Sequence, residues 1–132
     1  MADSDIARLR SEFNRTRPDN QVRLIAVFGS RARDDARASS DWDIAYLADP
    51  GFDADGLLGR LTGLLGTDHI DLVDLARASG QLRYRVARDG APVFARDPGE
   101  WHRFWTEAVS FWCDAGPVLR QAYAGILQEL GP

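Results

Sequence analysis

Val27-Phe28-Gly29-Ser30, followed after ten intervening residues by Asp41-Trp42-Asp43, is the part of the chain from which the fold can be argued. The apolar run from Val22 to Phe28 predicts a buried strand that leads into a Gly-Ser turn. The stretch from Asp43 to Leu47, apolar after its first residue, predicts the next strand. Because side chains alternate along a strand, the two aspartates at its start are expected to share one face.

Apolar periodicity along the rest of the chain predicts further helices and strands. Helices are expected at 4–16, 30–37, 54–65 and 79–89, and strands at 69–75 and 91–95. From residue 98 the pattern is helical and aromatic, with a break at Gly116-Pro117 and a last helix at about 118–130. This order predicts a single domain, 1–132, with an α/β or α+β sandwich fold.

Composition excludes several classes of protein. No apolar run approaches the roughly 18 residues of a membrane span, and a net charge of −4 gives no general attraction for nucleic acid. All 16 basic residues are arginine, so the lysine of a P-loop is absent. The N-terminus lacks signal-peptide features and the single cysteine, Cys113, suits a reducing compartment. We therefore expect a cytoplasmic protein with no membrane or direct nucleic-acid partner.

A third aspartate, Asp71, lies inside the predicted strand 69–75. If this strand pairs with the one that begins at Asp43, the side chain of Asp71 can join those of Asp41 and Asp43. Carboxylates about 5 Å apart repel one another by roughly 3 kcal/mol per pair at an effective dielectric constant near 20. A bound cation relieves this repulsion, and Mg²⁺ or Mn²⁺ suits an all-oxygen site.

The Gly-Ser turn beside these carboxylates predicts a phosphate site. Gly29 allows phosphate oxygens to approach the backbone, and the Ser30 hydroxyl and following amides can donate hydrogen bonds to them. Arg31 or Arg33 can add positive charge. Metal ions together with a phosphate cradle indicate phosphoryl or nucleotidyl transfer.

The Gly29-Ser30 pair, the Asp41-x-Asp43 motif and the later Asp71 resemble the motifs of the minimal nucleotidyltransferases of the DNA polymerase β superfamily. The resemblance covers about residues 20–96, with a departure at Asp34, where the family usually has glycine. It implies a nucleotidyltransferase core with a short mixed β-sheet flanked by helices, ATP as nucleotide donor, and two Mg²⁺ ions.

The same resemblance implies roles for the carboxylates. Asp41 and Asp43 would ligate both metals, and Asp71 would ligate the catalytic metal and help to deprotonate the acceptor hydroxyl. Asp74 is an alternative third carboxylate, although alternation places it on the face opposite Asp71. His69 either orients the nucleotide or acceptor or is a polar residue at the strand end. A basic segment either approaches the nucleotide or forms a solvated helix face: Arg83, Tyr84, Arg85 and Arg88.

The C-terminal extension, 98–132, carries an aromatic stripe at helical spacing. Such a stripe either packs on the domain's own sheet or binds a partner protein, because tryptophan is enriched at interface hot spots. Its members are Trp101, Phe104, Trp105, Ala108, Phe111 and Trp112.

Minimal nucleotidyltransferases are commonly paired with HEPN-domain toxins, and the resemblance implies an antitoxin that transfers AMP from ATP to a tyrosine of its HEPN partner. The small chain, with a possible partner helix and little room for an acceptor domain, favours a protein acceptor. Two alternatives stay open. One is a small-molecule nucleotidyltransferase of the aminoglycoside-modifying kind, and the other is an antitoxin that acts by binding alone.

Overall fold

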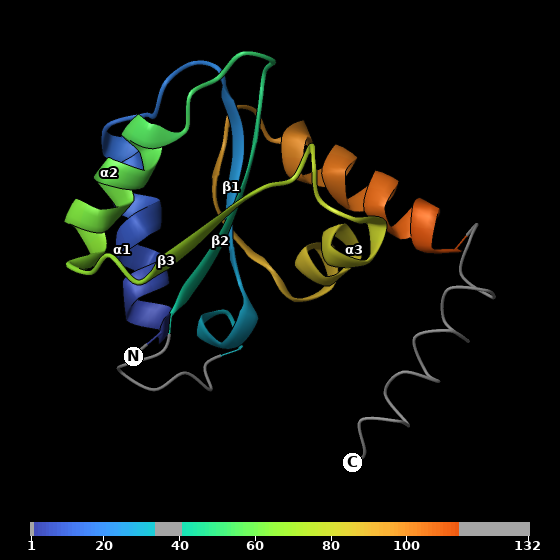
Figure 1. Ribbon diagram of the computed structural model, residues 1–132, viewed down its shortest axis with the longest axis horizontal. Helices are drawn as coiled ribbons and strands as arrows, with labels where there is room; N and C mark the ends of the chain where they lie inside the picture. Colours follow the sequence, from blue (N-terminus) through green and yellow to red (C-terminus); the bar gives the residue numbers. More distant parts are fainter. Residues whose placement is uncertain (1, 34–40, 114–132) are drawn as a thin grey trace.

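The computed structural model describes residues 2–33 and 41–113 of the 132-residue chain. Within these ranges a mixed four-stranded sheet has the order β3-β2-β1-β4 (Figure 1). β1 pairs antiparallel with β2 and β4, whereas β3 pairs parallel with β2. The strands are β1 (Val22–Phe28), β2 (Trp42–Ala48), β3 (Ile70–Asp74) and β4 (Ala91–Ala95).

Helices cover both faces of the sheet (Figure 1). α1 (Ala2–Arg15) and α2 (Asp55–Leu65) lie on one face. α3 (Gly80–Asp89) lies on the other face beside a helix at 99–113, which we call the aromatic helix. This arrangement confirms the expected mixed sheet flanked by helices. No helix in the described part of the chain combines the length and apolar character needed to cross a bilayer.

Alternation along β1 supplies both hydrophobic cores. Ile25 and Val27 point toward α1 and α2, whereas Leu24, Ala26 and Phe28 point toward α3 and the aromatic helix. Burial on both faces explains the nearly continuous apolar sequence of this central strand. Each face also receives apolar side chains from its helices: Ile6, Leu9, Phe13, Leu57 and Leu61 on the first, and Val86, Ala87, Phe104 and Ala108 on the second.

The observed elements agree closely with the predicted ones, with one exception. The bounds of β1 and β4 are as expected, and the other strands and helices begin and end within two residues of their predicted positions. In place of a helix from residue 30, the described chain has a 3₁₀ turn, η1 (Gly29–Arg31). Residues 34–37, Asp34, the Gly116-Pro117 break and the helix at 118–130 lie outside the described residues.

The start of the aromatic helix is tied to the sheet by a buried ion-pair network. The Glu100 side chain is 1% exposed and lies within 3.2 Å of three guanidinium groups, those of Arg23, Arg96 and Arg103. Burial alone would raise the pKa of Glu100, but hydrogen bonds and ion pairs with these arginines hold it below its usual value. Because Arg23 belongs to β1, the network fixes the helix against the central strand.

Candidate active site

The turn that follows β1 depends on glycine. Gly29 has φ of +72°, a left-handed conformation that other L-residues adopt only at a cost. Its carbonyl accepts hydrogen bonds from the amides of Ala32 (3.1 Å) and Arg33 (3.2 Å), which closes η1. A methyl group added at Gly29 would lie 3.2 Å from Cγ of Asp43 and would overlap Oδ2. The glycine thus lets the turn approach the Asp43 carboxylate, with Ser30 next in the turn.

The sheet register brings two of the predicted carboxylates together. Asp43 of β2 is the register partner of Asp71 on β3 and of Phe28 on β1. Asp43 shares its face with Ala45, and Asp71 shares its face with Val73, both of which pack on the α3 side. The two carboxylates are therefore neighbours on one face, as expected if the third strand pairs with the second.

The electrostatic environment of Asp43 reflects both its burial and its neighbouring carboxylates. The pKa of Asp43 is raised, first by partial burial and then by the negative charges of Asp71 and Asp41. The positive charges of Arg85 and Arg33 oppose this rise. A carboxylate in this position is poised to be neutralised by a cation or a proton.

Asp41 lies just before β2 rather than inside it, and its side chain is 70% exposed. The imidazole of His69 lies between two carboxylates, with Nδ1 3.5 Å from Asp41 and Nε2 3.6 Å from Asp68. The amide of Trp42 donates to the His69 carbonyl at 2.9 Å, so the ends of the two strands are joined there. Across residues 2–33 and 41–113, no three His, Cys, Asp or Glu side chains form a ready-made metal cluster.

Arg31 does not point toward Asp43 and Asp71. Its guanidinium stacks over the indole of Trp42, 4.6 Å from the ring centroid. Trp42 is buried in the core beneath α1 and α2, on the face opposite the two carboxylates. Arg31 thus packs on the residue between Asp41 and Asp43, and its expected contact with nucleotide stays a prediction.

Asp74 lies on the other face of the sheet, as alternation predicts. Its register partner is Tyr46, which packs with the core on the α1 and α2 side. The Asp74 carboxylate accepts a hydrogen bond from the amide of Ala76 (2.9 Å) and lies 3.9 Å from Arg77. Asp74 therefore stabilises the turn after β3 and is separated from the Asp43–Asp71 pair.

The basic residues of α3 differ in their environments, which the sequence alone did not distinguish. Arg85 influences the pKa of both Asp43 and Asp89, so its charge reaches the carboxylate face. Arg88 pairs with Asp89 at 2.8 Å, and Arg83 donates to the Leu75 carbonyl at 2.5 Å. The basic residues expected to behave alike therefore have different environments. Only the position of α3 over the sheet separates them.

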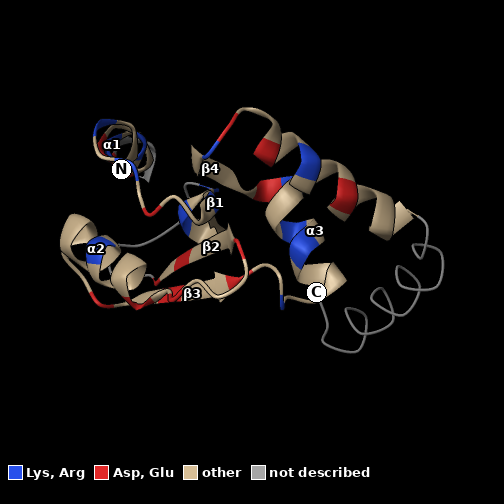
Figure 2. Ribbon diagram, turned by 90° about the horizontal axis from the view of Figure 1, so that it is seen from above, with Lys and Arg blue, Asp and Glu red and all other residues tan. Residues whose placement is uncertain are grey.

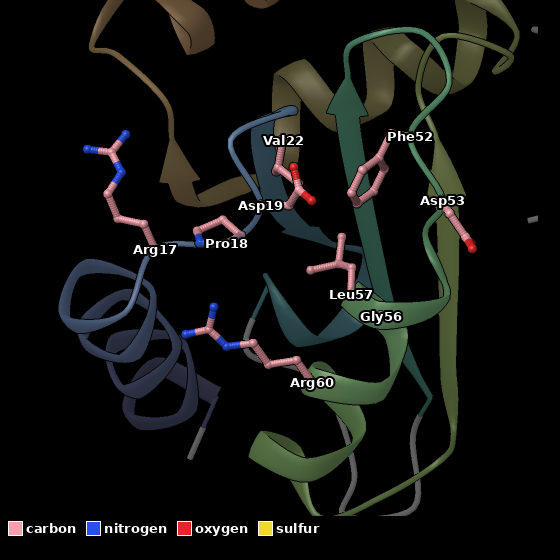
Figure 3. A pocket seen from close by; sticks show the side chains of 9 residues that line it. All are labelled: Arg17, Pro18, Asp19, Val22, Phe52, Asp53, Gly56, Leu57 and Arg60. Atoms are coloured by element: carbon pink, nitrogen blue, oxygen red, sulfur yellow. The ribbon is translucent and has the colours of Figure 1, made fainter.

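A hollow of about 210 Å³ lies at the end of β1 opposite the turn at Gly29 (Figure 3). Arg60 reaches into it and donates to the carbonyls of Glu12 (3.1 Å) and Thr16 (2.5 Å), which closes the end of α1. The hollow is separate from the carboxylate face, because it opens beside Val22 whereas the Asp43 site lies beyond Phe28. It is lined by Arg17, Pro18, Asp19, Val22, Phe52, Asp53, Gly56, Leu57 and Arg60.

The aromatic helix divides its stripe between core and surface. Phe104 and Ala108 are buried against the sheet. Trp105 and Phe111 are 42% and 50% exposed, which is unusual for side chains of this size. The described part of the helix thus closes the core with one side and presents large apolar groups on another.

Comparison with known proteins agrees with this geometry. A family model described as "Polymerase beta, Nucleotidyltransferase" matches residues 11–99. The chain is 31% identical over 96 residues to the protein adenylyltransferase MntA of Aphanizomenon flos-aquae (strain 2012/KM1/D3). The matched stretch spans 63% of this chain and 63% of that relative, just under two thirds of its length.

Solved structures show a similar architecture. A toxin–antitoxin crystal structure with AMP-PNP contains a chain that superposes with a TM-score of 0.64 at 25% identity, covering 93% of this chain and 99% of that one. A tri-AMPylated Shewanella oneidensis HEPN toxin in complex with an MNT antitoxin gives a TM-score of 0.59 at 23% identity, with the same coverage. At 23% identity, the match to this second structure shows a shared fold alone.

Proposed function

This chain belongs to the polymerase β nucleotidyltransferase family, and from that premise we propose that it is a protein adenylyltransferase acting as an antitoxin. It transfers AMP from ATP to a tyrosine hydroxyl of a HEPN-family toxin and releases pyrophosphate. The observation that carries this proposal is the pairing of Asp43 with Asp71 beside the turn at Gly29. That arrangement joins a carboxylate pair to a turn that phosphate can approach closely.

The reaction is a displacement at the α-phosphorus of ATP. The tyrosine oxygen forms a bond to the α-phosphorus, and the bond from that phosphorus to the oxygen bridging the β-phosphate breaks. Pyrophosphate leaves with the electron pair of the broken bond, and the hydroxyl proton passes to Asp71 or to solvent. Gly29 and Ser30 hold the triphosphate from the turn that follows β1.

The donor set suits a divalent metal. Asp41, Asp43 and Asp71 present only carboxylate oxygens, and burial followed by the negative charges of Asp71 and Asp41 raises the pKa of Asp43. We assign Mg²⁺, or Mn²⁺ in its place, to these three side chains. When bound, the metal would neutralise phosphate charge and activate the acceptor oxygen.

A protein acceptor is supported by the relatives and by the surface of the aromatic helix. The curated relative is named a protein adenylyltransferase, and the similar solved structures are toxin–antitoxin complexes. Exposed Trp105 and Phe111 provide an apolar surface of the kind that partner proteins cover. We place the reaction in the cytoplasm because a chain with one cysteine suits a reducing compartment.

ATP labelled at the α-phosphate tests the proposal directly. The purified chain is incubated with labelled ATP, Mg²⁺ and a candidate HEPN toxin, and the products are separated and digested for mass spectrometry. We expect label on the toxin, located on tyrosine, together with released pyrophosphate. Label on an added aminoglycoside instead of protein would identify a small-molecule nucleotidyltransferase.

The double variant Asp41→Asn, Asp43→Asn distinguishes catalysis from neutralisation by binding. It should fold and still bind the toxin, because both side chains lie near the surface, but it should neither label nor neutralise it. If the double variant neutralised the toxin as well as the wild type, binding alone would be the mechanism.

A further inference from the structure

We propose that Arg85 of α3 binds the β- and γ-phosphates of the nucleotide and supports departure of pyrophosphate. This inference rests on the proposed function, because it assigns a phosphate-binding residue to the same site. The cation was expected from Arg31 or Arg33, next to the Gly-Ser turn. The structure adds a further candidate, on a helix more than fifty positions later in the chain.

Topology places the last turns of α3 beside the phosphate turn. α3 ends at Asp89, and β4 begins at Ala91, whose register partner on β1 is Val27. Val27 lies two residues before Gly29, so the chain leaves α3 at the end of β1 that carries η1. The return of the chain from α3 to the sheet therefore brings this part of the helix to the site.

Packing fixes the orientation of this part of α3. Val86 and Ala87 are buried in the same cluster as Phe28, the residue immediately before Gly29. Arg85, adjacent to Val86, is exposed on the helix surface. Because Phe28 is also the register partner of Asp43, the helix lies over the sheet face that carries Asp43 and Asp71. Figure 2 shows α3 with bands of basic residues and the strands β2 and β3 with bands of acidic residues.

Arg85 also differs in its contacts from the other basic side chains near the site. Arg31 stacks on Trp42, and Arg88 pairs with Asp89. Within the described ranges, Arg85 makes no hydrogen bond or ion pair, although its charge lowers the pKa of both Asp43 and Asp89. A guanidinium near carboxylates but not bonded to them retains its donors for a ligand.

Phosphate is the ligand that matches these donors. Guanidinium groups bind phosphate oxygens through two parallel hydrogen bonds, and a triphosphate offers several such oxygens. The carboxylates act at the α-phosphate, where the bond is broken, and the turn beside the end of α3 holds the rest of the triphosphate, so we assign Arg85 to the distal phosphates. It would stabilise the charge that develops on pyrophosphate as it leaves.

Equilibrium binding measures this contact without requiring turnover. Isothermal titration calorimetry with Mg²⁺ compares the affinity of the wild type, Arg85→Ala and Arg85→Lys for AMP-PNP and for AMP. Arg77→Ala is the matched control, because it removes the same charge from a side chain that is 91% exposed beside Asp74. Circular dichroism melts establish that each variant is folded.

We expect Arg85→Ala to weaken AMP-PNP binding by about tenfold or more, to leave AMP binding within about twofold of wild type, and to raise the KM for ATP. The AMP-PNP affinity of Arg85→Lys should lie between those of wild type and Arg85→Ala, because lysine keeps the charge and loses the paired donors. Arg77→Ala should bind both ligands as the wild type does.

Two results would overturn the inference while leaving the proposed function intact. One is AMP-PNP affinity of Arg85→Ala equal to that of wild type. The other is an equal loss of affinity for AMP, which would show that Arg85 acts elsewhere than on the distal phosphates. Failure of the wild type to label any acceptor would instead refute the proposed function itself.

Discussion

Replacing Gly29 by alanine tests whether the turn and the carboxylate form one unit. The φ of +72° is left-handed, and an alanine held there costs about 1–2 kcal/mol relative to glycine. The added methyl group would also lie 3.2 Å from Cγ of Asp43 and overlap its Oδ2. Either the turn or the carboxylate must move, and both lie in the proposed active site.

The folding stability and the AMP-transfer rate of the Gly29→Ala variant should therefore fall together. A loss of about 1–2 kcal/mol corresponds to a decrease in Tm of about 3–8 °C for a chain of this size. A displacement of about 1 Å in a catalytic group lowers the transfer rate by about 100-fold. Thermal denaturation followed by circular dichroism gives the first quantity, and AMP transfer from labelled ATP gives the second.

Gly63→Ala is the matched control, since Gly63 lies on the exposed side of α2 and an added methyl group there meets no atom within 4 Å. It should leave the transfer rate unchanged and keep or raise stability by about 0.5–1 kcal/mol. A Gly29→Ala transfer rate within about threefold of wild type would show that the turn and the carboxylate are not one unit. Asp43 would then tolerate a change in the turn that it touches.

Three further outcomes follow from the same geometry. Asp43→Asn should lower AMP transfer by about 100-fold or more yet raise stability at neutral pH. The folded-state pKa of Asp43 is raised, so this residue contributes stability below its unfolded-state pKa, and that contribution is lost as the pH rises through its folded-state pKa. Urea unfolding at several pH values should therefore show that the stability gained by Asp43→Asn grows with pH. Glu100→Gln should cost about 2–3 kcal/mol in urea unfolding, because Arg23, Arg96 and Arg103 lose their shared carboxylate but can regain water. Because the folded-state pKa of Glu100 is lowered, its contribution to stability is present above its unfolded-state pKa and is lost as the pH falls through its folded-state pKa. The free energies of unfolding of wild type and Glu100→Gln should therefore converge in acid. Chelation by EDTA should abolish AMP transfer and added Mg²⁺ or Mn²⁺ should restore it, whereas transfer that survives chelation would contradict the metal assignment.

Local patterns in the chain were enough to predict most elements and several side-chain orientations. Two-residue alternation correctly separated Asp71 from Asp74, which lie on opposite faces of β3. The helix expected from Ser30 to Arg37 begins instead as a 3₁₀ turn over Gly29–Arg31, and residues 34–37 lie outside the described part of the chain. A glycine with positive φ and an adjacent carboxylate shape that turn, and neither is visible in the periodicity of the chain.

Roles that depend on contacts between distant segments required the folded chain. The aromatic stripe could not be divided into core and surface until the helix was placed on the sheet, where Phe104 is buried and Trp105 is exposed. Similarly, only the folded chain shows that the Arg31 guanidinium stacks on Trp42, while its binding of phosphate stays a prediction.

The order of residues along this chain was sufficient to identify a nucleotidyltransferase motif and to say which side chains share a strand face, because both follow from short-range spacing. The meeting of Asp43 with Asp71, and the placement of α3 over their face of the sheet, arise only when β3 pairs with β2 and α3 packs on Phe28. Those contacts join residues tens of positions apart. They are selected by burial of the whole apolar surface, a property that no local stretch of the chain contains.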